Sequence, residues 1–166
     1  MRTEGLSINL ATVRQQFGLK NGVEACLKLG ITAISPWRDH VHSTGVDEAA
    51  RIIRSNGMKV TGYCRGGLFP AADAAGRQAA VDDNLRMIDE AAAIGADCII
   101  LIGGGLPKGS RDIKAARGMF ADGMAAIRQH REIQSGDPGR LGVRRPAPPA
   151  PRRGPVAGGV RRARYR

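Results

Sequence analysis

One stretch of this chain restricts its fold more than any other: the apolar run from Cys98 to Ile102, which three glycines follow at 103–105. A strand with one face in water alternates polar and apolar residues, and this run has no polar position. It therefore predicts a parallel strand that is covered on both faces. Glycines after such a strand let the backbone turn sharply or approach a ligand, at the strand end where α/β folds place their sites.

The rest of the chain repeats a strand followed by a helix. Four strand patterns lie at 6–10, 31–35, 59–64 and 98–102. The residues at helical spacing between and after them are Leu19, Val23, Cys26 and Leu27; Val46, Ala49, Ala50 and Ile53; Val81, Leu85, Ile88 and Ala92; and Phe120, Met124 and Ile127. Strands that alternate with single helices predict a parallel sheet, either open and doubly wound or part of a (β/α)8 barrel.

Two features favour the barrel. The first strand-to-helix turn lacks the G-x-G-x-x-G fingerprint, and residues 105–110 have Lys and Gly in the wrong order for a phosphate-binding P-loop. The strand-to-helix connections are long and the helix-to-strand turns are short, as in barrels whose site is built from loops on one face. We therefore expect an α/β fold of the TIM-barrel type, with about four βα units of an incomplete (β/α)8 barrel.

The last part of the chain has a different composition. Residues 131–166 hold ten arginines against Glu132 and Asp137, and so carry most of the net charge of +11. In 136–166, 25 of 31 residues are Arg, Pro, Gly or Ala, which predicts a disordered basic tail after a partial barrel at 1–130. Such a tail could bind nucleic acid. Alternatively it is a frameshift product of a GC-rich gene, which we favour because the pattern is lost where a fifth strand is due.

The cysteines and the hydropathy point to an intracellular protein. Cys26, Cys64 and Cys98 form no C-x-x-C pair and have no histidine at metal-ligand spacing, which predicts buried free thiols. No apolar run approaches the roughly 20 residues that cross a bilayer, and the residues after Met1 lead into a strand rather than a signal-peptide core. We expect a cytoplasmic protein with no membrane contact.

Polar and aromatic side chains follow the expected strands, on the face where their carboxyl ends meet. An aromatic wall at Trp37 beside Arg38 and Arg65 suits a small polyhydroxylated or phosphorylated ligand. Alternatively, Trp37 closes the mouth of the barrel and the arginines pair with Asp39 or Asp73. The candidate substrate-binding residues are Asn9, Trp37, Arg38, Arg65, Gly66 and Gly67.

The acidic residues and histidines predict no metal site. His40 and His42 have a spacing that can chelate a metal, but no third ligand lies near them in the sequence. Among the acidic residues before the tail, only Asp39, Asp73 and Asp112 fall in the loops that follow strands. This is too few for a divalent cation or for a pair of acid and base groups, so no catalytic residue is assigned.

Four segments resemble the sugar phosphate isomerase/epimerase family, the xylose-isomerase-like TIM barrels: 6–12, 34–39, 60–67 and 97–101. The resemblance covers roughly residues 5–130. It implies a barrel that holds a divalent metal (Mn, Mg or Co) and isomerises or epimerises a small sugar, sugar phosphate or hydroxy-carbonyl compound through an enediolate. The superfamily includes the endonuclease-IV type of DNA-repair enzymes, so a nucleic-acid-binding protein that uses the basic tail is the alternative.

The chain also departs from that family. Members have eight βα units, with metal ligands mostly in the second half, whereas this chain carries about four. We therefore expect a protein that lacks the metal ligands and is inactive as an isomerase. The first and fourth strands would be open edges of the sheet, which favours a homo-oligomer.

Overall fold

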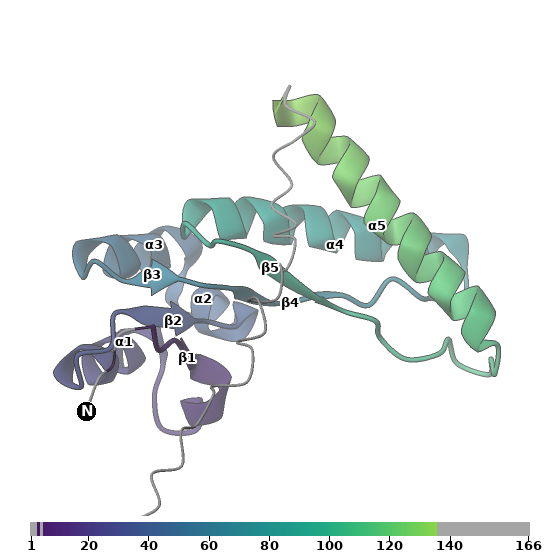
Figure 1. The fold of residues 1–166 in the computed structure, drawn as a ribbon. Helices are drawn as coiled ribbons and strands as arrows, with labels where there is room; N and C mark the ends of the chain where they lie inside the picture. The colour runs from purple at the N-terminus through teal and green to yellow at the C-terminus, as the bar shows by residue number, and fades with distance from the viewer. Residues whose placement is uncertain (1–2, 4, 136–166) are drawn as a thin grey trace, which may run out of the picture.

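The computed structural model describes residue 3 and residues 5–135 (Figure 1). Its elements, in chain order, are β1 (Ile8–Asn9), the 3-10 helix η1 (Leu10–Val13), α1 (Leu19–Lys28), β2 (Ala33–Ser35), α2 (Arg38–Thr44), α3 (Val46–Ser55), β3 (Lys59–Val60), β4 (Tyr63–Gly67), α4 (Ala74–Ala93), β5 (Ile99–Ile102) and α5 (Ile113–Ser135). Residues 136–166, most of the expected tail, lie outside the described residues. No described helix is long and apolar enough to cross a membrane.

All strand pairs are parallel: β1 pairs with β2, β2 with β3, and β4 with β5. β3 and β4 follow each other within one strand position, between β2 and β5. Single bridges from Trp37 to Cys64 and from Val60 to Ala96 connect the two sets of strands. A sheet whose parallel neighbours follow chain order, each joined through helices, is the arrangement of a TIM barrel. This confirms the α/β, TIM-barrel-type fold expected from the sequence.

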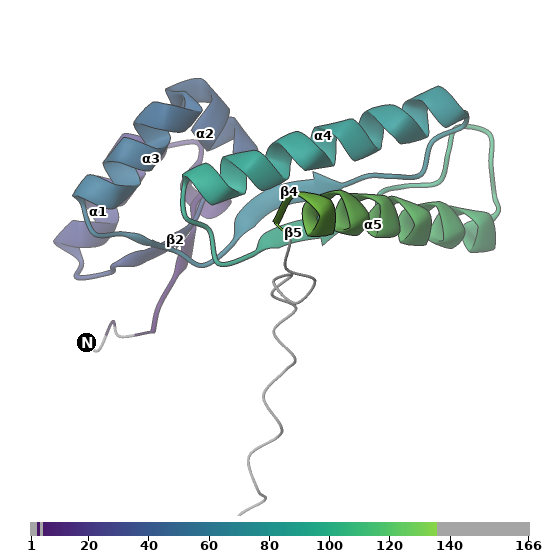
Figure 2. The same ribbon diagram turned by 90° about the horizontal axis from the view of Figure 1, so that it is seen from above.

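The core lies between the sheet and its helices. Figure 2 shows α3 and α4 on the same side of the strands, and the helices pack in sequence, α1 on α3, α3 on α4 and α4 on α5. The largest wholly buried side chains include Leu10, Leu19, Ile34, Tyr63 and Met87. At about 25 cal/mol for each Å² of buried apolar surface, this packing is the main source of stability.

α4 is fixed to β4 by one buried amide. Asn84 is 1% exposed, and its side chain accepts a hydrogen bond from the Gly67 N–H at 2.7 Å and donates one to the Gly67 carbonyl at 2.8 Å. A Cβ on Gly66 would meet Asn84 and Met87 at 2.5 and 2.6 Å. Gly66 is thus needed for the close approach of α4 to the strand, whereas a Cβ on Gly67, whose φ is +91°, would meet the backbone of Ile102 in β5.

Three local differences from the sequence-based expectation have physical reasons. The connection after β1 contains η1, whose first turn is capped by the Asn9 side chain. The loop expected after Pro36 is helix α2, which has seven residues and is too short to show a full apolar period. The expected strand 59–64 is divided into β3 and β4 because the chain changes its hydrogen-bond partner there: the Thr61 N–H donates to the Ile34 carbonyl and the Tyr63 N–H to the Cys98 carbonyl.

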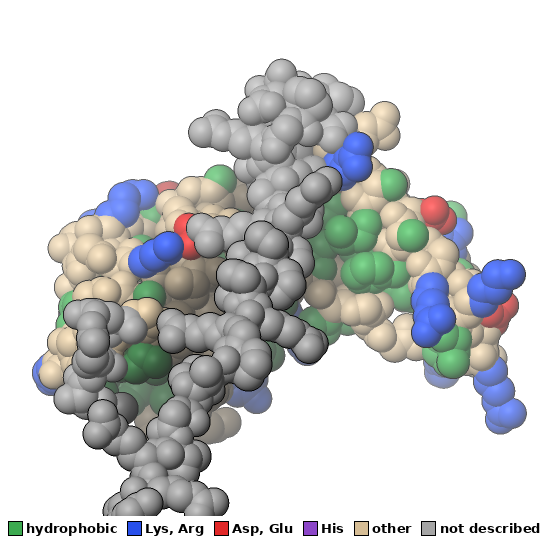
Figure 3. All heavy atoms as spheres, in the orientation of Figure 1, with side chains coloured by type: hydrophobic (Ala, Val, Ile, Leu, Met, Phe, Trp, Pro, Cys, Tyr) green, Lys and Arg blue, Asp and Glu red, His purple; other side chains and the backbone are tan. Residues whose placement is uncertain are grey.

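β5, which contains most of the apolar run at 98–102, is not covered on both faces by the described residues, contrary to expectation. Ile100 in β5 is 38% exposed, and its neighbours in the strand are half-buried. Among the described residues β5 is the last strand of the sheet, so one edge of it has no neighbour. Figure 3 shows apolar side chains gathered where α5 lies beside β5, and Met124 of α5 is 39% exposed.

Candidate functional site

The carboxyl ends of β1, β2 and β4 bring the candidate residues to one edge of the sheet. Asn9 ends β1, Trp37 follows β2, and Arg65 lies within β4, whose Cys64 is bridged to Trp37. The Asn9 side chain accepts a hydrogen bond from the Ala11 N–H at 3.1 Å and so starts η1. Asn9 therefore shapes the loop at this edge, and it does not line the hollow beside Trp37.

Two arginines lie over the ring of the single tryptophan. The Cζ atoms of Arg14 and Arg65 are 6.0 and 5.7 Å from the centroid of the Trp37 ring, within the range of a cation–π interaction. The indole Nε1 of Trp37 is buried and has no hydrogen-bond partner among the described residues. These three side chains line a hollow of about 400 Å³. The other residues that line it are Arg38, Asp39, His42, Leu68 and Asp83.

Arg38 also borders the hollow, but its guanidinium group pairs with acidic residues of α4. Its Nη1 donates to Asp83 at 2.6 Å, and its Nε and Nη2 donate to the two oxygens of Glu90 at 3.2 Å. Glu90 also accepts from the Tyr63 hydroxyl at 2.8 Å and contacts His42 Nε2 at 2.9 Å. Arg38 thus pairs with two acids of α4, and an anionic ligand would have to compete with both.

The network changes the titration of its members. Burial raises the pKa of Glu90, but hydrogen bonds from Arg38, His42 and Tyr63 outweigh it, so the pKa lies below its ordinary value. The hydrogen bond from Arg38 likewise lowers the pKa of Asp83. Burial and the bond to Glu90 raise the pKa of Tyr63 well above its ordinary value. All three groups keep their ordinary neutral-pH charge, as a structural ion network requires.

This network predicts how stability depends on pH. The lowered pKa of Glu90 contributes stability above its ordinary value of 4.5, and that contribution is lost as the pH falls through the folded-state pKa. The raised pKa of Tyr63 contributes below pH 10, and that contribution is lost only as the pH rises further. We expect the free energy of unfolding lost in Glu90→Gln, measured with urea, to be largest between pH 5 and pH 9 and to shrink toward pH 3. A loss that stays constant down to pH 3 would contradict the assignment.

Gly66 and Gly67 lie beneath α4 rather than at the pocket. Both are buried in β4: Gly66 packs against Asn84 and Met87, and Gly67, with a positive φ, lies against the backbone of Ile102 in β5. The structure therefore brings together Trp37, Arg65 and Arg14, with Arg38 at the side. Their role in binding substrate remains a prediction.

The described residues do not fit a divalent metal. They contain no group of three or more His, Cys, Asp or Glu side chains that could hold an ion. Beside the hollow, Asp83 and Glu90 already accept hydrogen bonds from Arg38, and His42 is held by Glu90. Asp39 is then a single carboxylate at the hollow. No step is therefore derived through a metal in this part of the chain.

The cysteines offer no activated nucleophile here. Burial raises the pKa of the Cys64 and Cys26 thiols, whereas a reactive cysteine needs a lowered pKa. Cys98 is exposed, contrary to the expectation of three buried thiols, because β5 is an edge strand in the described part of the chain.

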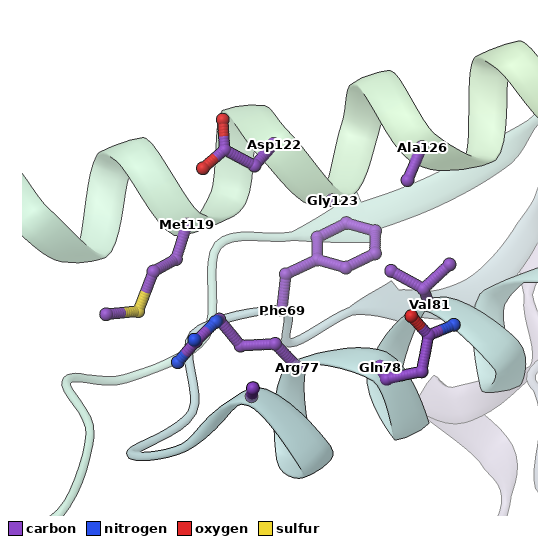
Figure 4. A pocket seen from close by; sticks show the side chains of 9 residues that line it. Phe69, Arg77, Gln78, Val81, Met119, Asp122, Gly123 and Ala126 are labelled. Carbon is purple, nitrogen blue, oxygen red and sulfur yellow. The ribbon is translucent and has the colours of Figure 1, made fainter.

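A second hollow of about 260 Å³ lies between α4 and α5 (Figure 4). Phe69 projects into it, and its ring makes an edge-to-face contact with Phe120 at 5.4 Å between centroids. Arg77 and Asp122 lie at its sides, and most of its other lining is apolar. It is a gap between packed helices, beside the loop that joins β4 to α4.

The fold is that of α/β-barrel proteins, and the hollow at Trp37 lies at the carboxyl ends of the strands, where such proteins place their sites. Residues 23–133 match the family described as xylose isomerase-like TIM barrels. The chain belongs to this family, as the resemblance in its sequence indicates. None of the curated proteins compared with the chain matches it.

Solved structures agree with the family. Protein SMc04130 from Sinorhizobium meliloti 1021 is 58% identical, with a TM-score of 0.77 over 80% of this chain and 48% of that chain. An AP endonuclease of family 2 from Brucella melitensis is 16% identical (TM-score 0.59; 75% and 49% covered), and a D-psicose 3-epimerase is 18% identical (0.56; 74% and 46%). The last two likenesses concern the fold alone. The chain spans about half the length of these structures.

The sequence analysis missed Arg14 and the two acids that hold Arg38. Asp83 and Glu90 are seven residues apart, which places them on one face of α4 two turns apart. That spacing was the available signal for a shared cationic partner. Arg14 gave no signal, because its position over Trp37 depends on η1, which the sequence did not predict.

Proposed function

We propose that this chain is a sugar isomerase/epimerase-like protein that binds a small sugar or hydroxy-carbonyl compound beside Trp37. The observation that supports this most is the hollow at the carboxyl edge, where two guanidinium groups lie about 6 Å from the centroid of an aromatic ring. Aromatic surface packs against the C–H groups of a sugar, and guanidinium N–H groups donate to its oxygens. The free cysteines suit a reducing compartment, so we place the protein in the cytoplasm.

The proposal distinguishes binding from turnover. In the intact family a divalent metal polarises the substrate carbonyl while acidic residues move a proton. In the described residues Asp83 and Glu90 are held by Arg38, which leaves Asp39 as the one other carboxylate at the hollow. Binding that favours ground state and transition state equally does not raise the rate. We therefore propose that this 166-residue chain binds sugar without isomerising it.

Trp37 provides the binding assay, since it is the only tryptophan. We expect its fluorescence to change saturably with a panel of ketoses and aldoses, and the change to be lost in Arg65→Ala but kept in Arg51→Ala. Arg51 is an exposed arginine paired to Glu48 on α3. A flat response to every sugar would contradict the proposal.

A coupled isomerase and epimerase assay on the same panel tests the second half of the proposal. We expect no turnover with added manganese, magnesium or cobalt. Metal-dependent turnover that disappears in Arg65→Ala would show that a catalytic site forms in this chain.

A second candidate, nucleic-acid binding, is favoured by the ten arginines at 131–166. A salt titration against duplex DNA separates it from the first. If the chain shortened to residue 135 binds as tightly as the full chain, the arginine-rich segment is not responsible.

We also propose that two copies associate through the open sheet edges. The side of β5 that no described residue covers carries Ile100, 38% exposed, and lies beside the apolar side of α5. Four successive strand positions are half of the eight in a barrel, so a two-fold axis along the barrel would set β5 of one copy beside β1 of the other.

A further inference from the structure

The hollow at Trp37 also suggests which class of sugar it takes. We propose that Arg14 and Arg65 together form a subsite for an anionic group on the substrate, a phosphate ester or a sugar carboxylate. This inference rests on the proposed function and adds the charge of the ligand to it. Arg14, which has no assigned role, is its distinguishing residue.

The charges around the hollow are not balanced evenly. Of its three arginines, Arg38 is matched by Asp83 and Glu90. Arg14 and Arg65 have no carboxylate partner among the described residues. Each of them contacts the ring of Trp37 instead. Other exposed arginines of the described chain, such as Arg51 and Arg86, do pair with a nearby acid. Arg54 and Arg77 also lack an acidic partner in the described part of the chain and donate to backbone carbonyls. What distinguishes this site is that two such cations lie at one hollow, against the exposed carboxylate of Asp39.

The geometry allows both guanidinium groups to reach one anion. Each Cζ lies within about 6 Å of the same ring centroid, so the two are no more than about 12 Å apart. Both side chains are exposed and can close on a ligand between them. The indole limits where each group can lie, which reduces the entropy lost on binding. Planar guanidinium groups also match the paired oxygens of phosphate and carboxylate.

The test titrates Trp37 fluorescence with fructose, fructose 6-phosphate, gluconate and inorganic phosphate at one ionic strength. We expect the phosphate ester or gluconate to bind at least tenfold more tightly than fructose, since hydrogen bonds between charged partners are the strong ones. Arg14→Gln and Arg65→Gln should each weaken binding of the anionic sugar about tenfold more than they weaken binding of fructose. Arg65→Lys, which keeps the charge, should recover part of the loss, and Arg51→Gln should change nothing.

The outcomes separate this inference from the proposed function. Equal affinity for fructose and both charged sugars would overturn the anionic subsite while the sugar site stands. Loss of affinity in Arg65→Gln but not in Arg14→Gln would also overturn it, because the subsite needs both cations. No response to any sugar would overturn the proposed function, and inorganic phosphate binding that depends on both arginines would still support the subsite. Equal urea midpoints for all variants would show that the losses are not losses of folding.

Discussion

Replacing Arg38 with alanine is expected to lower the free energy of unfolding by about 3 kcal/mol, the low end for removing one partner of a buried ion pair. Arg38 and Glu90 are 16% and 13% exposed, so the loss leaves Glu90 largely desolvated with only Tyr63 and His42 as partners. Asp83 is 43% exposed and adds little, because water can replace the arginine there. Urea unfolding at pH 7, followed by Trp37 fluorescence, measures the change.

Arg86→Ala is the matched control for this experiment. Arg86 bridges to the same Asp83 at 3.2 Å but is 64% exposed, so its loss should cost less than about 0.5 kcal/mol. Equal losses for the Arg38 and Arg86 variants would mean that burial of the Glu90 network does not matter. Arg38→Ala combined with Glu90→Gln should recover part of the loss, since it removes the unpaired charge.

Replacing Ile100 with lysine is expected to weaken self-association of the full chain by roughly tenfold to a hundredfold. A charge on the uncovered side of β5 would have to be desolvated when a second copy covers that strand. We expect sedimentation equilibrium of the parent chain to show a monomer–dimer equilibrium at micromolar concentrations.

Leu29→Lys controls for adding a lysine to the surface. Leu29 ends α1 and is 68% exposed, away from the edge of β5. The edge-to-edge account fails if the Leu29 variant weakens association as much as Ile100→Lys does. It also fails if the parent stays monomeric at the highest concentration reached.

The order and pairing of the strands could be predicted, but the cover of the last one could not. The apolar run that ends at Ile102 is typical of a strand, and the glycines at 30, 57 and 95 are typical of helix ends. The structure has a strand and helix ends at these positions. Whether Ile100 is buried depends on what lies beyond β5, which its own residues do not encode. α2 was missed for a related reason, because buried contacts of His40 and Val41 hold it rather than a long apolar period.

The position of the candidate site could be predicted from the sequence better than the ion pairs that its residues make. Carboxyl ends of parallel strands meet at one edge, so Trp37 and Arg65 were expected together, and they are. Arg38 follows Trp37 directly, yet it points to acids 45 and 52 residues further along the chain. Such long-range pairings depend on the packing of α4 against the sheet, which spacing within one element does not reveal.

Backbone and indole NMR of the ¹⁵N-labelled full chain tests most directly whether the edge around Trp37 is the sugar site. Trp37 gives a single indole N–H signal, because the chain has no other tryptophan. On titration with the sugar that changes its fluorescence most, we predict that this signal and the amides of Arg14, Arg65 and Leu68 shift together with one Kd. Shifts confined to Phe69, Met119 and Gly123, which line the hollow between α4 and α5, would contradict the account and move the binding site there.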